Sequence, residues 1–530
     1  MSHKFKESLM TEYDYPNMIK ERNPLTFRLR SNVSIHEEAG KLYLVLAYPL
    51  KSVAIHPFWR EVVGLLSKET FTGFEAILSI TGNTDPAKME GFLMDLVRKG
   101  LLEVQGVPDM AEFPSVSIII PVRNRPEDME ACLNSLMRLN YPKNKLEVLV
   151  VDDASTDSTP EVVSRFPVRL IRNKQNRQAS FCRNLAAHQA KGDILAFIDS
   201  DCLADPGWLM ELIPAFRDAT LGAVGGRVDA YYDENNLDRY EKVKSSLIMG
   251  TWPKRSQKDN PFFYVPSCNL LVRSKLFIGL GGFNETLVVG EDVDLCFRIK
   301  KQGYQLEYRT MGKIYHKHRN QLIPFCKRRF EYGTSEPLLQ KMHPDKVKNM
   351  IFPPAKTAFW LLALLAVITA QMGPLALSGL IVVADALLAI VRHRNLPVSM
   401  WSVCGSVIRS YPTFLYHCCS FVSRYYLIFA LAIGIIWPVG GIVIIAMHLL
   451  AGVVEFRLKK PAMNPLVFLM YFTLEQLSYQ LGVWYGCIKY RCFMPVNPRI
   501  VTGLPAREAP EISYLKTPNR RHTCVEELRP

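Results

Sequence analysis

The stretch Ile194-Leu195-Ala196-Phe197-Ile198-Asp199-Ser200-Asp201 decides the fold of the central part of this 530-residue chain. An apolar run with strand propensity ends there in two carboxylates one residue apart. Because side chains at i and i+2 of an extended backbone point the same way, Asp199 and Asp201 are expected to converge at the end of a strand. Open α/β sheets bind ligands at that end, and carboxylate oxygens suit Mg²⁺ or Mn²⁺. Taken alone, Asp-x-Asp also fits a solvated turn, so the context has to decide.

Predicted strands and helices alternate on both sides of this stretch. Apolar runs at residues 115–121 and 146–151 predict two further strands, and the segments between the strands show helical spacing. The expected helices cover residues 127–139, 159–166 and 179–190. This alternation predicts an α/β domain with a mostly parallel, nucleotide-binding type of sheet, placed at residues 107–350.

Polar motifs follow the predicted strands or lie in the loops beyond them. In chain order they are Pro121-Val122-Arg123-Asn124-Arg125, Asp152-Asp153-Ala154-Ser155, Arg183-Asn184, Asp199-Ser200-Asp201, Gly281-Gly282-Phe283, Glu291-Asp292, His316-Lys317-His318-Arg319 and Arg328-Arg329-Phe330. Because α/β enzymes collect ligands at strand ends, these motifs are expected to form one site.

In this order, over about residues 116–330, the motifs resemble the family 2 glycosyltransferases, which have the GT-A nucleotide-sugar fold. The resemblance implies a nucleotide-sugar donor, usually UDP-linked, and an inverting single displacement. It implies that Asp292 is the catalytic base at the acceptor hydroxyl, with Glu291 supporting it or touching the acceptor. Asp294 is the fallback base and is expected to cap or pack. Glu291-Asp292 alone would also fit an ordinary helix N-terminus.

The same resemblance, together with the charges of the side chains, indicates which residues bind the nucleotide-sugar donor. The expected donor-binding residues are Pro121, Arg123, Asn124, Asp152, Asp153, Arg177, Asp199 and Arg328. Asp152 and Asp153 can accept hydrogen bonds from the base and the ribose of the nucleotide. A divalent cation, Mn²⁺ or Mg²⁺, is expected on Asp201, with Asp199 shared between ribose and metal, to neutralise the departing diphosphate. His316 is preferred to His318 as a further ligand, and a surface histidine is the alternative for either.

Arg328-Arg329-Phe330 stands where processive relatives carry a Gln-x-x-Arg-Trp motif. The Gln and the Trp are both missing in register, so processive synthesis through a membrane channel is not expected. Either arginine can still pair with the diphosphate, and a membrane-surface role is the alternative.

Residues 1–106 predict a separate, winged-helix-like domain. Strands are expected at residues 25–29 and 101–104 and helices at 57–66 and 85–97. Such domains bind DNA or peptides. Residues 85–97 lack the basic face of a DNA-recognition helix, which favours a peptide or protein partner over nucleic acid. A purely structural appendage is the alternative.

The C-terminal part predicts a helical membrane region at residues 351–495, followed by a basic tail at 496–530. Residues 357–391 are long enough for two short spans that turn at Gly373-Pro374. A further candidate, residues 425–454, is broken at 438–441, and residues 402–424 are expected in the interface. Residues 465–488 are a weaker candidate, because Glu475 and Gln476 interrupt them.

Composition agrees with a membrane-associated enzyme. Apolar residues make up 48% and charged residues 22%, which excludes a disordered chain. The net charge of +14 is compatible with nucleic acid, an acidic substrate or an anionic membrane surface. Basic clusters such as Lys327-Arg328-Arg329, Lys459-Lys460 and Arg520-Arg521 flank the apolar stretches and favour the membrane, with solvated faces as the alternative.

The predicted location is a cell membrane, with multi-pass or re-entrant helices and a cytoplasmic catalytic domain. Residues 1–23 carry charges throughout and have no apolar core, so no signal peptide is expected there and the N-terminal half is expected to stay in the cytoplasm. The twelve cysteines contain no Cys-x-x-Cys pair, which fits a reducing compartment and argues against a zinc site.

The order of the three predicted regions along the chain makes the resemblance more specific. A small N-terminal domain similar to the peptide chaperones of pyrroloquinoline quinone biosynthesis, fused to a family 2 catalytic domain and an apolar tail, resembles the glycosyltransferases of mycofactocin biosynthesis. That resemblance implies β-linked transfer of glucose from UDP-glucose to a peptide-derived redox cofactor. A transferase for cell-envelope polysaccharide or a lipid-linked sugar is the alternative. A non-catalytic binding module is a third hypothesis, and Asp199, Asp201 and Asp292 argue against it.

Overall fold

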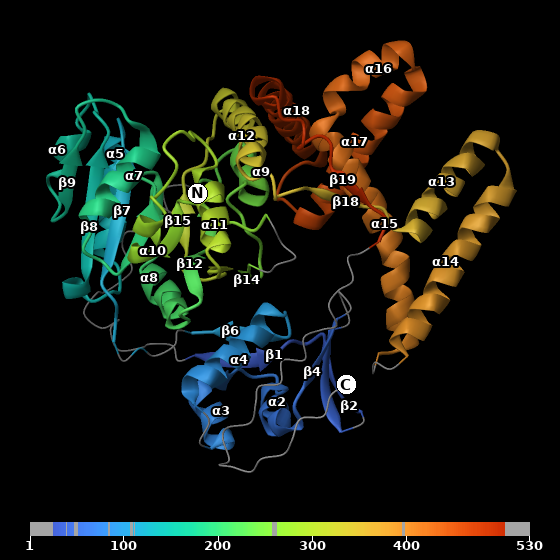
Figure 1. Ribbon diagram of the computed structural model, residues 1–530, viewed down its shortest axis with the longest axis horizontal. Helices are drawn as coiled ribbons and strands as arrows, with labels where there is room; N and C mark the ends of the chain where they lie inside the picture. Colours follow the sequence, from blue (N-terminus) through green and yellow to red (C-terminus); the bar gives the residue numbers. More distant parts are fainter. Residues whose placement is uncertain are drawn as a thin grey trace. The chain divides into compact units, whose positions relative to one another are not determined.

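The computed structural model describes residues 25–38, 40–46, 51–82, 85–106, 110, 112–256, 262–394 and 398–503 (Figure 1). Three predicted features lie outside the described residues. They are residues 1–23, where no signal peptide is expected, the Arg520-Arg521 cluster, and most of the basic tail. Two compact units are present: one contains residues 110–350 and 413–500, and the other contains 22–109 and 351–412.

An eight-stranded sheet forms the centre of the first unit, in the order β14-β16-β12-β15-β10-β7-β8-β9. Its strands are β7 (Val116–Val122), β8 (Leu146–Asp152), β9 (Arg169–Arg172), β10 (Ile194–Ile198), β12 (Leu221–Gly225), β14 (Lys254–Arg255), β15 (Asn269–Arg273) and β16 (Gln305–Tyr308). The neighbours β10, β7, β8 and β9 run parallel, whereas β15 is antiparallel to both β10 and β12. The mostly parallel half matches the prediction, and β15 joins the two halves.

Helices cover both faces of this sheet, which explains its uninterrupted apolar strands. Alternate residues of β7 enter different cores. Ile118 and Ile120 pack with α5 (Pro126–Met137), and Ile119 packs with α7 (Gln178–Gln189). Every residue of β10 is buried. Asp199 and Asp201 follow directly after its last residue, Ile198. The second predicted helix, expected over residues 159–166, is shorter than expected and forms α6 (Thr159–Val163).

A smaller sheet completes the edge at which the aspartates emerge. It has the order β11-β17-β13, with β11 (Cys202–Ala204), β13 (Val228–Ala230) and β17 (Ile314–His316). The antiparallel register of β11 and β17 places Cys202 opposite His316. A residue at the end of the catalytic domain is thereby brought beside Asp201.

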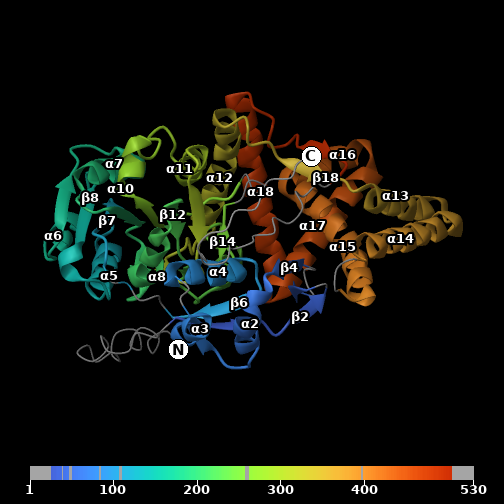
Figure 2. The ribbon, with the colours of Figure 1, turned by 60° about the horizontal axis from the view of Figure 1, so that its bottom comes forward.

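Two long helices of the same unit pack side by side, α12 (Leu322–Met342) and α18 (Pro465–Tyr490), as Figure 2 shows. Glycines allow the close approach, since a Cβ at Gly333 would lie 2.0 Å from the Tyr479 carbonyl oxygen. Residues 465–488, expected to be a weak span, thus form a continuous helix whose Glu475 and Gln476 are buried.

Within the described residues, the helical C-terminal region contains two helices long and apolar enough to cross a membrane, α14 (Met372–His393) and α17 (Pro438–Lys459). The count becomes three if the bent pair of α15 (Met400–Tyr425) and residues 427–436 is one span. The predicted turn lies slightly earlier than expected: α13 (Pro354–Thr369) ends at Thr369, and Gly373-Pro374 fall in the first turn of α14.

The N-terminal domain has its own core. Strand β1 (Thr26–Leu29) pairs with β5 (Thr72–Gly73) and β6 (Leu102–Gln105), and the meander β2 (Val33–Glu38), β3 (Lys41–Leu46) and β4 (Lys51–Ile55) adds a second sheet. Helices α2 (Arg60–Leu66), α3 (Phe74–Thr81) and α4 (Pro86–Arg98) pack on the buried residues of these strands. A small winged-helix-like domain, an α/β catalytic domain and a helical C-terminal region confirm the predicted fold class.

Candidate active site

One cavity of about 370 Å³ lies at the strand ends of the catalytic domain. Most of the predicted motifs contribute to its lining. Its charged residues are six acids and six arginines, namely Asp153, Asp199, Asp201, Glu241, Glu291, Asp292, Arg123, Arg125, Arg183, Arg319, Arg328 and Arg329. His316 and His318 complete the polar wall. Acidic side chains and arginines are therefore equal in number in this lining.

Asp201 is a buried carboxylate whose two oxygens have different neighbours. Its Oδ2 lies 2.5 Å from Arg125 Nη1 and 3.4 Å from Arg319 Nη1, while its Oδ1 lies 3.5 Å from His316 Nε2. Burial alone would raise the pKa of Asp201, but His316, Arg125 and Arg319 outweigh it and lower the pKa below the usual range. Asp201 is therefore ionised near neutral pH.

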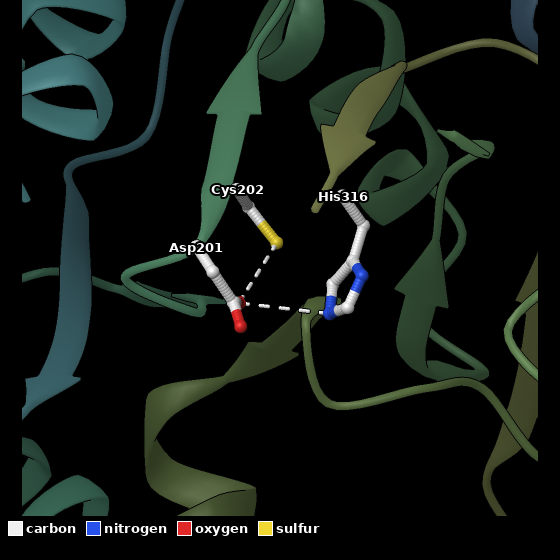
Figure 3. A group of neighbouring side chains, drawn as sticks. All are labelled: Asp201, Cys202 and His316. Atoms are coloured by element: carbon white, nitrogen blue, oxygen red, sulfur yellow. Dashed lines mark hydrogen bonds and ion pairs between the residues drawn. The ribbon is translucent and has the colours of Figure 1, made fainter. Parts of the chain in front are cut away.

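The ring of His316 points from the end of β17 toward Asp201 and Cys202 (Figure 3). Ligand atoms of these three residues lie within 4.8 Å of one another. Burial raises the pKa of Cys202 well above its usual value, so its thiol stays protonated and is a poor ligand. A carboxylate oxygen and an imidazole nitrogen remain. The arginines hold Asp201 Oδ2, and its Oδ1 has only a weak thiol donor, Cys202 Sγ at 4.0 Å, besides His316. This donor set fits Mn²⁺ or Mg²⁺.

The second histidine lies behind the first. His318 is buried, and its Nδ1 lies 3.2 Å from His316 Nδ1. Burial, aided by His316 and Arg329, lowers the pKa of His318 to about 3. Of the two histidines, only His316 belongs to the group of possible ligands around Asp201, and its role as the ligand stays a prediction.

Asp292 lies at the start of α11 (Glu291–Lys301), which follows a glycine in the left-handed region. At Gly290, with φ +87, an added Cβ would also lie 2.7 Å from the Leu339 side chain. The Asp292 carboxylate accepts N–H bonds from Ser267 at 3.2 Å and from Val293 at 2.8 Å. Burial, followed by the charge of Glu291, raises the pKa of Asp292 to about 7. A carboxylate of this kind is suited to take a proton near neutral pH.

Arg183 of α7 connects the two sides of the cavity. Its guanidinium is buried and donates to Asp199 Oδ1 at 2.5 Å and to Glu291 Oε1 at 2.9 Å. Asp199 therefore faces an arginine, and Glu291 is held beside Asp292. Asp294 packs away from the cavity on Arg298. Arg183 stands in one of the sequence motifs, but only the structure indicates a role for it.

Of the predicted donor residues, Pro121, Arg123, Asp153, Asp199 and Arg328 line the cavity. The other three lie outside its lining. The Asp152 carboxylate accepts the Ser155 N–H at 3.2 Å, the Asn124 side chain accepts the Thr156 N–H at 2.8 Å, and the Arg177 guanidinium stacks on Phe181. These three side chains support the loops around the cavity.

Two acids that the sequence interpretation did not assign lie behind the histidines. Arg329 is buried between Glu241 of α9 (Asn236–Lys244) and Glu475 of α18. Burial, together with Glu475, raises the pKa of Glu241 to about 7 despite the nearby Arg329. The position of Glu475 inside an apolar stretch was a visible signal, because a carboxylate there needs a buried partner.

Residues 117–277 match the model of glycosyl transferase family 2. The chain is 28% identical over 413 residues to the pre-mycofactocin glycosyltransferase of Mycobacterium tuberculosis, an alignment that covers 74% of this chain and 84% of that protein. It is 33% identical over 205 residues to the glycosyltransferase AglE of Haloferax volcanii, covering 37% of this chain and 64% of that protein. Among solved structures, the mannosyltransferase PcManGT from Pyrobaculum calidifontis, in complex with GDP-Man and Mn²⁺, is 20% identical with a TM-score of 0.36, covering 57% of this chain and 88% of that one.

Proposed function

We propose that this chain, which contains a family 2 glycosyltransferase domain, transfers a hexose from a UDP-linked donor to a peptide-derived redox cofactor by a metal-dependent, inverting displacement. The proposal rests on two carboxylates of one cavity whose surroundings shift their pKa values in opposite directions. The pKa of Asp201 is lowered by cations, and the pKa of Asp292 is raised by burial. Such a division separates a permanently charged ligand from an acid–base group.

Asp201 Oδ1 and His316 Nε2 would hold the divalent cation, with Asp199 nearby. When bound, the cation would supply positive charge to the diphosphate as the glycosidic bond breaks. The lowered pKa of Asp201 supports this assignment, because an ionised carboxylate can bind a divalent cation at neutral pH. Arg125 and Arg319 keep the Asp201 carboxylate in one orientation.

Asp292 would accept the proton of the acceptor hydroxyl. The acceptor oxygen then bonds to the anomeric carbon, the bond from that carbon to the diphosphate oxygen breaks, and the proton ends on Asp292. Attack from the face opposite the leaving group inverts the configuration. The Ser267 N–H fixes the base, and Arg183 keeps Glu291 beside it.

A peptide-derived acceptor is supported by the similarity to the pre-mycofactocin glycosyltransferase, which extends well beyond the family 2 domain. On this proposal the donor is UDP-glucose, the product is a β-linked oligosaccharide, and the N-terminal domain presents the acceptor. The apolar helices α14 and α17 support association with a membrane, and on this proposal the catalytic domain lies at its cytoplasmic face. They also favour a second candidate, transfer to a lipid-linked or cell-envelope acceptor.

The test is a panel of UDP- and GDP-sugars with Mn²⁺, the full-length chain and a premycofactocin-like acceptor, followed by mass spectrometry. We expect hexose additions from UDP-glucose, their loss with EDTA, and their recovery when Mn²⁺ is restored. Absence of transfer from every UDP-sugar would contradict the donor assignment. Transfer to a lipid extract but not to the peptide-derived acceptor would favour the second candidate.

A further inference from the structure

Helix α9 forms part of the cavity wall and presents a carboxylate to the cavity. Glu241 lines the cavity, although its side chain is only 6% exposed. Its Oε1 accepts a hydrogen bond from Arg329 Nη2. Its Oε2 accepts no hydrogen bond from any residue that the structure describes, yet this oxygen is not fully shielded from solvent. Oε2 therefore faces the cavity as an unpaired acceptor.

A hydroxyl lies one turn further along the same face of the helix. The backbone N–H of Ser245 donates to the carbonyl oxygen of Glu241 at 2.9 Å, which is the i,i+4 contact of an α-helix. Ser245 is buried and also lines the cavity. Its Oγ accepts the N–H of Leu247 at 3.3 Å, and within the described part of the chain its own hydroxyl proton has no acceptor. This wall thus offers a hydrogen-bond acceptor and a donor on one face.

Contacts outside the cavity hold α9 in place. The helix begins at a capping box, in which the Asn235 and Asp238 side chains accept each other's backbone N–H. Tyr240 packs on Phe468 of α18, with ring centres 5.2 Å apart. The polar side chains on the cavity face of α9 are therefore preorganised for a ligand.

This wall reaches from the histidines to the neighbourhood of the candidate base. At one end, Glu241 Oε2 lies 3.9 Å from His318 Nδ1, and that ring contacts the candidate metal ligand. At the other end, the carbonyl oxygen of Ser246 accepts the Tyr264 hydroxyl at 3.2 Å. Burial and then the charge of Asp292 raise the pKa of Tyr264, so the candidate base is close to that end.

The chemistry of the proposed reaction places the transferred hexose along this wall. The anomeric carbon is bonded to the diphosphate, which the cation holds, and is attacked by the hydroxyl that Asp292 deprotonates. The hexose must therefore lie between the cation and the base. A carboxylate repels the anionic diphosphate, whereas sugar hydroxyls can donate to its oxygens. The unpaired oxygen of Glu241 is thus suited to the sugar and not to the phosphates.

We propose that Glu241 is a specificity-determining residue: its Oε2 accepts a hydrogen bond from one hydroxyl of the transferred hexose, and Ser245 donates to a neighbouring oxygen of the same sugar. The inference rests on the proposed transfer of a hexose from a UDP-linked donor. It assigns sugar recognition to a helix outside all of the predicted motifs. A hexose without that hydroxyl would leave the buried carboxylate oxygen unpaired in the complex and would bind less tightly.

The test compares Glu241→Gln with a matched control, Glu475→Gln. In the first variant the amide oxygen can still accept from Arg329, which leaves an NH₂ donor in place of the unpaired acceptor. Glu475 lies 3.2 Å from the same arginine but outside the cavity lining.

The ligands are UDP, UDP-glucose and four UDP-glucose analogues that lack the 2-, 3-, 4- or 6-hydroxyl of the glucose. Isothermal titration calorimetry measures their binding to the full-length chain in detergent with Mn²⁺. The pH is kept one unit above the Glu241 pKa of about 7, so that the carboxylate is ionised.

We expect UDP-glucose to bind about tenfold more weakly to Glu241→Gln, the lower end for a hydrogen bond to a charged group, and UDP to bind within about twofold of wild type. In the wild type, one of the four analogues should lose about the same factor. That loss should shrink to within about twofold in Glu241→Gln, because the partner of the missing hydroxyl is already gone. Glu475→Gln should match the wild type for every ligand. Ser245→Ala should weaken UDP-glucose about threefold and leave UDP unchanged, and it serves if Glu241→Gln does not fold.

Three results would overturn the sugar contact while leaving the proposed function intact. They are an equal loss for the same analogue in wild type and Glu241→Gln, a loss of UDP affinity as large as that of UDP-glucose, and an equal loss in Glu475→Gln. Unchanged UDP-glucose affinity in folded Glu241→Gln, or in Ser245→Ala where it replaces that variant, would have the same consequence. A wild-type chain that binds no UDP-sugar would instead contradict the donor assignment on which the inference rests.

Discussion

Asp292 and Asp201 have the same side chain and lie in one cavity, yet their surroundings differ. Two arginines and a histidine surround Asp201, whereas Asp292 has two backbone N–H donors and an acidic neighbour. The consequence is that only Asp292 changes its charge near neutral pH. Under the proposed function this difference assigns the base to one residue and the metal ligand to the other.

Asp292→Asn should lower kcat by about 10²- to 10⁴-fold and leave donor binding nearly unchanged, because it removes only the base. In the wild-type chain, Asp292 acts as a base only when ionised. The rate should therefore fall about tenfold per pH unit below a pKa of about 7 and level off above it. Rate–pH profiles and UDP titration of both proteins measure the two effects. A parallel loss of UDP affinity in the variant would contradict this role for Asp292.

Residue types at strand ends could be predicted from sequence, but their partners could not. Asp199, Asp201 and Asp292 follow recognisable patterns, and the structure places all three around one cavity. Which of Asp152 and Asp153 lines that cavity depends on the direction of each side chain, and only Asp153 does. Contacts between distant residues, such as Arg183 with Glu291, have no local signal.

Arg183 links helix α7 to the end of strand β10 and to the start of helix α11. Arg183→Met should leave two carboxylates without their cation and destabilise the catalytic domain by about 3 kcal/mol, the lower end for a broken buried pair, because Asp199 is partly exposed. The melting temperature in detergent measures the loss. Arg239→Met is the control: Arg239 pairs with Asp233 at 3.5 Å, and both side chains are exposed, 41% and 53%, so its removal should cost less than about 1 kcal/mol. Equal melting temperatures for the two variants would show that the Arg183 bridge is not structural.

The positions of helices and strands could be predicted from the periodicity of apolar residues. The order of the strands in the sheet could not. The three central strands and their helices lie close to the predicted residues, because buried strands and amphipathic helices have different apolar periods. The insertion of β15 between β10 and β12 depends on contacts distant in sequence. Helix α18 looked like a poor span because of Glu475, yet that residue faces protein partners.

The N-terminal domain is expected to determine which acceptor receives the sugar. Its core is made of its own residues, so its removal is expected to leave the catalytic core intact. Deleting residues 1–106 should abolish transfer to a peptide-derived acceptor and retain Mn²⁺-dependent hydrolysis of the UDP-sugar, since the donor residues all lie beyond residue 120. Mass spectrometry of the acceptor and release of UDP measure the two reactions on the same preparation. The full-length Asp292→Asn variant is the control, because it should keep the N-terminal domain and lose transfer through the base alone. Full transfer by the truncated chain would make the N-terminal domain a structural appendage, and loss of both reactions would show that it supports the catalytic fold.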